Sequence, residues 1–101
     1  MIIEITGSVS VDDRTQRYVE KAIGSLDRYL AKTSRQSTRA EVILRRVNRA
    51  HGNKYEAEVH MHIADTVISA KDSTLNILAA LDIVRAKLVI ELKKSPDQRL
   101  P

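Results

Sequence analysis

The feature that most constrains the fold is a strict alternation of apolar and polar side chains between residues 55 and 63. Successive side chains of a β-strand point to opposite faces, so this pattern predicts a strand with one buried face and one face open to water. The apolar positions are Tyr55, Ala57, Val59, Met61 and Ile63, and the polar positions are Glu56, Glu58, His60 and His62. A sheet containing such a strand needs a covering layer on one face only.

Other segments supply the rest of that sheet and its cover. Residues 2–6, 40–47 and 66–71 are short apolar runs typical of strands, and Ala64-Asp65 predicts a tight turn. Apolar residues recur at helical spacing from the capping residues Asp12 and Asp13 to about Ala31. A second helical stripe begins after a cap at Asp72 or Ser73 and ends near Lys94.

The predicted order is therefore β-α-β-β-β-α, an α/β fold of the two-layer α+β type. It has a four-stranded sheet with both helices packed on one face. The first helix would be a right-handed crossover between two parallel strands. A chain of 101 residues fits one domain, which we place at residues 1–95, followed by a short flexible tail at 96–101.

Several chemistries are missing from the sequence. There is no cysteine, which excludes disulfides, thiolate zinc sites and thiol nucleophiles. No serine lies in a nucleophile-elbow motif, and the three glycines are too far apart to form a phosphate-binding loop. Glu56 and Glu58 are expected on a water-exposed strand face, which does not favour acid catalysis. We therefore expect that the protein is not an enzyme. We also expect it to be cytoplasmic, without a leader or a membrane segment.

The histidines raise the question of a metal. His60 and His62 point the same way from one strand with Glu58 beside them, and three such ligands could bind zinc. Alternating polar residues are, however, what any two-layer domain shows on its open sheet face, and no fourth ligand is visible. We expect both histidines to point into solvent, with no metal and no cofactor bound.

The basic residues are unevenly distributed. Residues 35–54 hold six basic residues and one acidic residue, a net charge of +5, whereas the rest of the chain holds 11 basic and 12 acidic residues. The polar side of the first helix also sorts its charges, because at about 100° per residue its basic residues fall on one line. Those residues are Arg14, Arg17, Lys21, Arg28 and Lys32. A localised basic surface indicates a polyanionic partner, nucleic acid before membrane, although solvated basic patches without partners are also common.

The way in which RNA could be bound is constrained as well. The chain has no Phe and no Trp, and two of its three tyrosines, Tyr18 and Tyr29, fall on an apolar helix face. Base stacking on single strands needs exposed aromatic rings. Lys and Arg contacts to the phosphates of folded RNA are therefore expected instead.

An ordered series of short motifs resembles the ribosome hibernation-promoting factors, a family that includes the ribosome-associated translation inhibitor. The series covers residues 2 to about 94 and comprises Ile5-Thr6-Gly7, Tyr18-Val19-Glu20, Leu26-Asp27-Arg28-Tyr29, Glu56-Ala57-Glu58-Val59, Ile68-Ser69-Ala70, Ala79-Ala80-Leu81-Asp82 and Lys87-Leu88 with Leu92 and Lys94. The resemblance implies the same fold and binding to ribosomal RNA of the small subunit, in the channel for messenger and transfer RNA. It also implies translation arrest under stress or in stationary phase, without a metal, cofactor or small-molecule substrate. Long members add a C-terminal dimerisation domain, so this chain resembles a short form or an excised N-terminal domain.

The candidate RNA-binding residues combine the first-helix line, the basic stretch and two positions that match family bases on the second helix. They are Arg14, Arg17, Lys21, Arg28, Lys32, Arg45, Arg46, Arg49, Lys54, Lys87 and Lys94.

The second helix departs from the family. Asn76 and Leu78 stand where the family usually has Asp and Tyr, Ile90 stands where a base is common, and Arg85 falls on the inner side in place of an aliphatic residue. Ile83, Ala86 and Ile90 would share an outward side. The alternative function is therefore a non-catalytic interaction or dimerisation module that uses this side, with weak homo-oligomerisation through the second helix.

Overall fold

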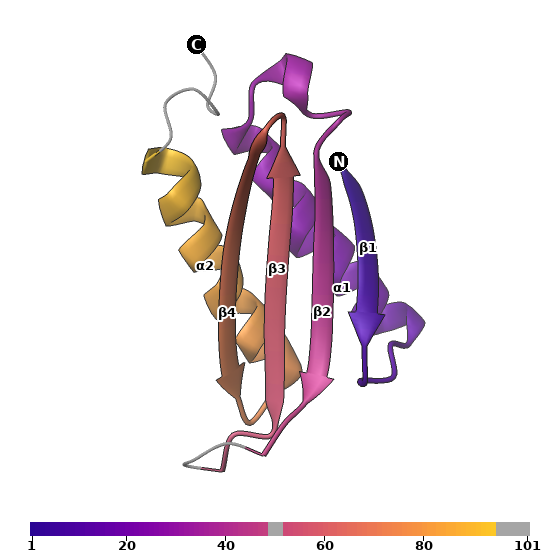
Figure 1. The fold of residues 1–101 in the computed structure, drawn as a ribbon. Coiled ribbons are helices and arrows are strands. Elements are labelled where there is room, and N and C mark those ends of the chain that lie inside the picture. The colour runs from indigo at the N-terminus through magenta and orange to yellow at the C-terminus, as the bar shows by residue number, and fades with distance from the viewer. Residues whose placement is uncertain (49–51, 95–101) are drawn as a thin grey trace.

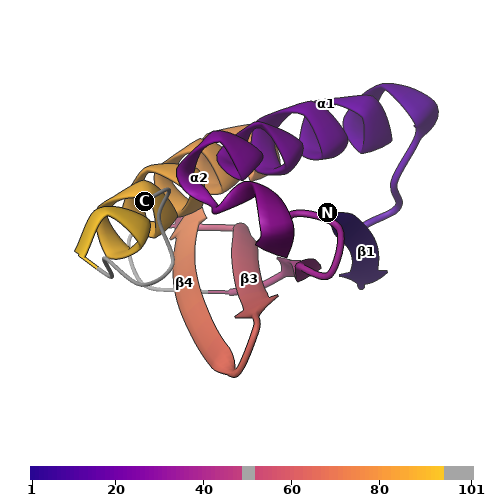
Figure 2. The same ribbon diagram turned by 90° about the horizontal axis from the view of Figure 1, so that it is seen from above.

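The computed structural model describes residues 1–48 and 52–94, and these residues form a four-stranded sheet with two long helices on one of its faces (Figures 1 and 2). The strands β1 (Ile2–Gly7), β2 (Arg39–Arg46), β3 (Tyr55–Ile63) and β4 (Thr66–Thr74) lie side by side in sequence order. β1 and β2 are parallel, and the other neighbours are antiparallel. The predicted fold class and element order are confirmed.

The helices α1 (Asp13–Gly24) and α2 (Ile77–Lys94) cover the face that the alternating pattern predicted to be buried. Val59 and Met61 of β3 and Leu81 and Leu88 of α2 are fully buried in the core between the two layers. The opposite sheet face has no covering layer in the described structure, as Figure 2 shows. Among the described residues, no helix is long and apolar enough to cross a membrane.

The first helix ends earlier than the prediction of about Ala31. The α-helix stops at Gly24, and two short 3₁₀ turns follow, η1 (Ser25–Tyr29) and η2 (Lys32–Ser34). The carbonyl oxygen of Ala22, which a continuing α-helix would use, accepts instead from Ser25 Oγ at 2.7 Å and from Arg85 Nε at 3.0 Å. Leu26, on the first of these turns, is nevertheless fully buried in the core.

The predicted cap of the second helix at Asp72 or Ser73 was also wrong. Both residues belong to β4, where they pair with Ala57 and Glu56 of β3. The cap is Asn76, whose Oδ1 accepts from the backbone N–H groups of Leu78 at 2.8 Å and Ala79 at 3.3 Å. The strand ladder extends through Thr74 because its backbone pairing with β3 outweighs a local capping signal.

Candidate nucleic-acid interface

The polar side of α1 carries three exposed cations, Arg14, Arg17 and Lys21. Asp12 caps the helix by accepting from the Thr15 N–H at 2.7 Å, which fixes where the first turn begins. In the part of the chain that the structure describes, none of the three cations forms an ion pair with a carboxylate. These charges are therefore available to an external anion.

The single basic line predicted along the first helix holds only as far as α1 extends. Arg28 lies on η1 and Lys32 on η2, beyond the end of the α-helix. A 3₁₀ turn advances by about 120° per residue instead of 100°, so these side chains leave the line set by Arg14 and Lys21. Both are nevertheless exposed. They extend the basic surface to the other end of α1 but do not continue its line.

Arg46 and Lys54 lie at the two ends of the connection between β2 and β3. The Val47 N–H donates to the Lys54 carbonyl at 2.9 Å, and the Arg46 N–H donates to Ser8 Oγ at 2.9 Å. This second contact places Arg46 against the segment that leads from β1 into α1. Both cations are exposed, and the Arg46 guanidinium lies 5.7 Å from the ring centroid of Tyr55. Arg49, also predicted here, lies outside the described residues.

On α2, the two predicted lysines are exposed but already have partners. Lys87 Nζ donates to the Lys71 carbonyl at 3.0 Å and lies 3.2 Å from Asp72 Oδ2. Lys94 Nζ lies 3.5 Å from Glu91 Oε1. The neighbouring Lys93, which the sequence prediction did not include, is exposed and lies 5.9 Å from the ring centroid of Tyr29 on η1. Only the fold brings the end of α2 to η1, so sequence spacing gave no signal for it.

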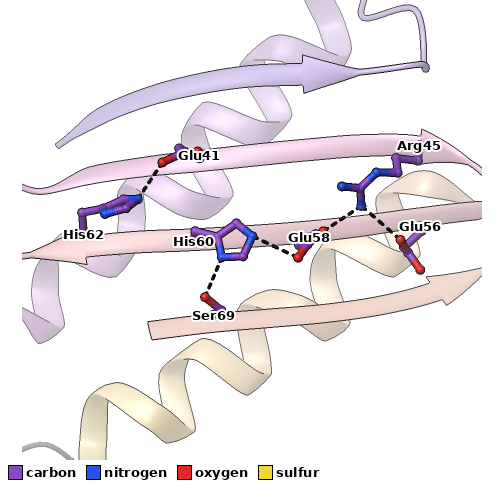
Figure 3. A network of polar contacts seen from close by, with 7 residues as sticks. All are labelled: Glu41, Arg45, Glu56, Glu58, His60, His62 and Ser69. Atoms are coloured by element: carbon purple, nitrogen blue, oxygen red, sulfur yellow. Dashed lines mark hydrogen bonds and ion pairs between the residues drawn. The ribbon is translucent and has the colours of Figure 1, made fainter. Parts of the chain in front are cut away.

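The open face of the sheet carries a different kind of charge arrangement (Figure 3). Arg45 lies on this face, and its Nη1 donates to Glu58 Oε1 at 2.7 Å and to Glu56 Oε1 at 3.1 Å. The prediction that Glu56 is open to water was wrong, because Glu56 is only 5% exposed. The hydrogen bond from Arg45 lowers the pKa of Glu58, and the same contact raises the pKa of Arg45. The charge of Arg45 is thus neutralised by these carboxylates.

His60 and His62 were expected to point into solvent. In the structure, each has a polar partner on the sheet face. His60 Nε2 lies 2.9 Å from Glu58 Oε2, and His60 Nδ1 lies 2.6 Å from Ser69 Oγ. His62 Nε2 lies 2.6 Å from Glu41 Oε1 (Figure 3). Within residues 1–48 and 52–94, no group of three or more histidine or carboxylate side chains is arranged to hold a metal ion.

The two faces therefore differ in what their cations can bind. On the sheet face, Arg45 is held by carboxylates, and Arg39 Nη2 lies 3.5 Å from Glu41 Oε1. On the helix side, Arg14, Arg17 and Lys21 are exposed and unpaired among the described residues. An anion approaching the helix side meets positive charge without first having to displace an internal carboxylate.

The predicted orientations on α2 are confirmed. Ile83 and Ile90 are 39% and 54% exposed, and Ala86 beside them is also exposed. Arg85 points inward, and its Nη2 donates to Ser25 Oγ at 2.9 Å between the two helices.

Solved structures with the same fold include the two proteins that follow. The crystal structure of the Thermus thermophilus Protein Y N-terminal domain aligns with a TM-score of 0.76 and 24% identity, over 93% of this chain and 98% of that chain. A ribosomal subunit interface protein from Coxiella burnetii aligns with a TM-score of 0.72 and 18% identity, over 93% of this chain and 96% of that chain. No match was found among curated proteins.

The sequence itself matches a protein-family model over residues 3–99, nearly its whole length. This match confirms the family resemblance predicted from the ordered motifs. The chain belongs to the family described as Sigma 54 modulation protein / S30EA ribosomal protein.

Proposed function

We propose that residues 1–95 bind the small ribosomal subunit in the channel that messenger and transfer RNA would occupy, and thereby silence translation under stress or in stationary phase. Family membership and the fold shared with a ribosomal subunit interface protein support the ribosome as partner. The observation that carries the proposal is the set of exposed, unpaired cations on the helix side, led by Arg14, Arg17 and Lys21. The role is non-catalytic, requires no cofactor and is exercised in the cytoplasm.

The mode of binding follows from the side chains available. Tyr18 and Tyr29 are packed against the hydrophobic core, which removes them as stacking platforms. The Tyr18 hydroxyl also donates to Asp82 Oδ1 at 2.6 Å, and this contact raises the pKa of Tyr18. Arg and Lys contacts to phosphates remain, and such contacts follow the shape of a folded RNA more than its sequence.

The test is a charge reversal on the helix side with a matched reversal on the sheet. Arg14→Glu combined with Arg17→Glu changes the net charge by the same amount as Arg39→Glu combined with Lys71→Glu on the open face. Each reversed phosphate contact should weaken binding by about 1–2 kcal/mol, so the α1 pair should lower the affinity for small subunits at least about 30-fold. Co-sedimentation with purified small subunits and inhibition of cell-free translation measure this loss.

The sheet pair should retain most of both activities, because those positions lie on the opposite face from the helices. Equal losses in the two proteins would show that net charge alone matters and that the helix side is no defined site. Binding that survives both reversals would contradict the assignment of the helix side as the contact surface, and absence of small-subunit binding by the unaltered protein would contradict the ribosome as partner. Urea unfolding of each protein controls for loss of fold.

A further inference from the structure

The outer side of α2 carries a stripe of four exposed apolar residues, Ala79, Ile83, Ala86 and Ile90. At about 100° per residue, they fall within about 60° of one another on the helix surface. The opposite side of α2 is buried in the core, and Arg85 occupies the side toward α1. No described residue covers the stripe, and the stripe itself contains no charge.

The spacing and the sizes of these residues form a pattern. The steps along the helix are four, three and four residues, the alternation that helix–helix seams use. The sizes alternate small, large, small, large. In an antiparallel pair of α2 helices, Ala79 lies opposite the partner's Ile90, and Ile83 lies opposite the partner's Ala86. Both pairs have the same midpoint, between Val84 and Arg85, so one two-fold axis satisfies both.

We infer that α2 pairs with α2 of a second copy of this chain in an antiparallel, two-fold symmetric contact. Each isoleucine then fills the space left by an alanine, the interdigitation that close packing favours. A parallel pair would place Ala opposite Ala and Ile opposite Ile. The alanine pairs would then leave gaps, and the isoleucine pairs would be overcrowded. The second copy is therefore the occupant whose shape the stripe fits.

The association must be weak. The stripe spans 11 residue steps, about 16 Å at 1.5 Å per residue. A single helix seam of that length falls well short of the roughly 800 Å² per partner that a stable interface buries. The exposed cations of α1 lie on the same side of the sheet as the stripe, so two copies bring like charges together. Added salt should strengthen this contact by screening that repulsion, whereas it weakens binding to phosphates.

Sedimentation velocity of the full chain up to about 1 mM tests the inference, because Kd values in this range give a concentration-dependent dimer. Ile83→Glu should weaken the dimer at least about tenfold, whereas Val67→Glu, an exposed apolar site on the sheet face, should not. Ala86→Ile and Ile83→Ala should each weaken it. The double variant with both changes should restore it, because each facing pair again combines one Ala with one Ile.

A monomer at every concentration and salt level would overturn the inference, as would equal losses in the Ile83→Glu and Val67→Glu proteins. Failure of the double variant to recover would overturn the antiparallel pairing. None of these results bears on ribosome binding, which the co-sedimentation of Arg14 and Arg17 variants tests separately. The two proposals can therefore fail independently.

Discussion

Arg45 and Arg46 are neighbours in the sequence but lie in opposite electrostatic surroundings. Arg45 lies among the carboxylates of Glu56 and Glu58 on the sheet, and Arg46 is exposed at the end of β2 beside Tyr55. A strand places successive side chains on opposite faces, so one step along the chain separates the two roles. Arg45 should matter for stability, and Arg46 for binding an anion.

Arg45→Met should therefore lower the free energy of unfolding, because it removes the ion pairs that the Arg45 guanidinium makes with Glu56 and Glu58. Arg45 itself is 38% exposed, so solvent screening limits the loss to about 1 kcal/mol. Arg46→Met removes the same charge from an exposed site and should change stability by less than about 0.5 kcal/mol. Urea unfolding at neutral pH makes the comparison. A larger loss in the Arg46 protein would mean that the sheet network contributes nothing.

The pH dependence of the same contact has a definite sign. Arg45 lowers the pKa of Glu58 below its ordinary value of 4.5. A carboxylate with a lowered pKa in the folded state stabilises the fold above its unfolded-state pKa, and this contribution disappears as pH falls through the folded-state pKa. The destabilisation caused by Glu58→Gln should thus be full at neutral pH and decline below pH 4.5. In an Arg45→Met background, the decline should be much smaller. Urea unfolding between about pH 3 and pH 7 measures the destabilisation in both backgrounds. An equal decline in the two backgrounds would show that Glu58 and Arg45 are not energetically coupled.

At the scale of elements, both helix boundaries are set by side chains from other parts of the chain or by the competing sheet. α1 ends and η1 begins where the side chains of Ser25 and Arg85 donate hydrogen bonds to the Ala22 carbonyl. The inward arginine thus has a structural role, since it joins α2 to the end of α1. Its hydrogen bonds to Ala22 and Ser25 explain how a charged residue is accommodated on the inner side of α2.

The start of α2 yields a prediction about its cap. Asn76→Ala removes the acceptor for the Leu78 and Ala79 N–H groups and should destabilise the protein by about 1 kcal/mol. Ser73→Ala, at a position that belongs to β4, loses only the 3.3 Å hydrogen bond that Ser73 Oγ accepts from Asn53 Nδ2 and should cost about 0.5 kcal/mol. Thermal or urea unfolding of the two proteins tests this order. The reverse order would place the cap at Ser73 after all.

At the scale of the whole molecule, the layered fold separates two electrostatic surfaces. On the sheet, carboxylates pair with Arg39 and with Arg45, and Figure 3 shows the Arg45 contacts. On the helix side, the cations Arg14, Arg17 and Lys21 of α1 are exposed. A domain with a net charge of only +4 can in this way present a strongly positive face. Binding to a phosphate backbone should therefore depend strongly on salt despite the modest total charge.

If about five basic side chains contact phosphates, the logarithm of the affinity for small subunits should fall against the logarithm of salt concentration with a slope of about −3.5 to −4.5. Arg14→Gln combined with Arg17→Gln should reduce the magnitude of that slope by about 1.4 to 1.8, because two contacts are lost. Co-sedimentation over a salt series gives both slopes. A slope near zero in the unaltered protein would remove phosphate contacts from the mechanism.

The sequence by itself was enough for the architecture and the family. The alternation from Tyr55 to Ile63 predicted a sheet with one covered face, and the two helical stripes predicted its cover. These patterns can be read from one chain because strand and helix periods depend only on local backbone geometry. The outward position of Ile83 and Ile90 followed in the same way.

Only the tertiary structure decided which cations are available. Arg45 and Arg14 look alike in the sequence, but Arg45 faces two carboxylates that stand opposite it on β3, 11 and 13 residues along the chain. The same holds for the end of α1, where Arg85, 63 residues further along the chain, donates to the Ala22 carbonyl. It also holds for the cap of α2, which is Asn76 because Asp72 and Ser73 lie in β4 and pair with β3. Whether a charged side chain is paired, or a backbone carbonyl accepts a side-chain hydrogen bond, depends on which groups the fold brings within about 3 Å. The helix and strand periods in the sequence carry no information about those distances.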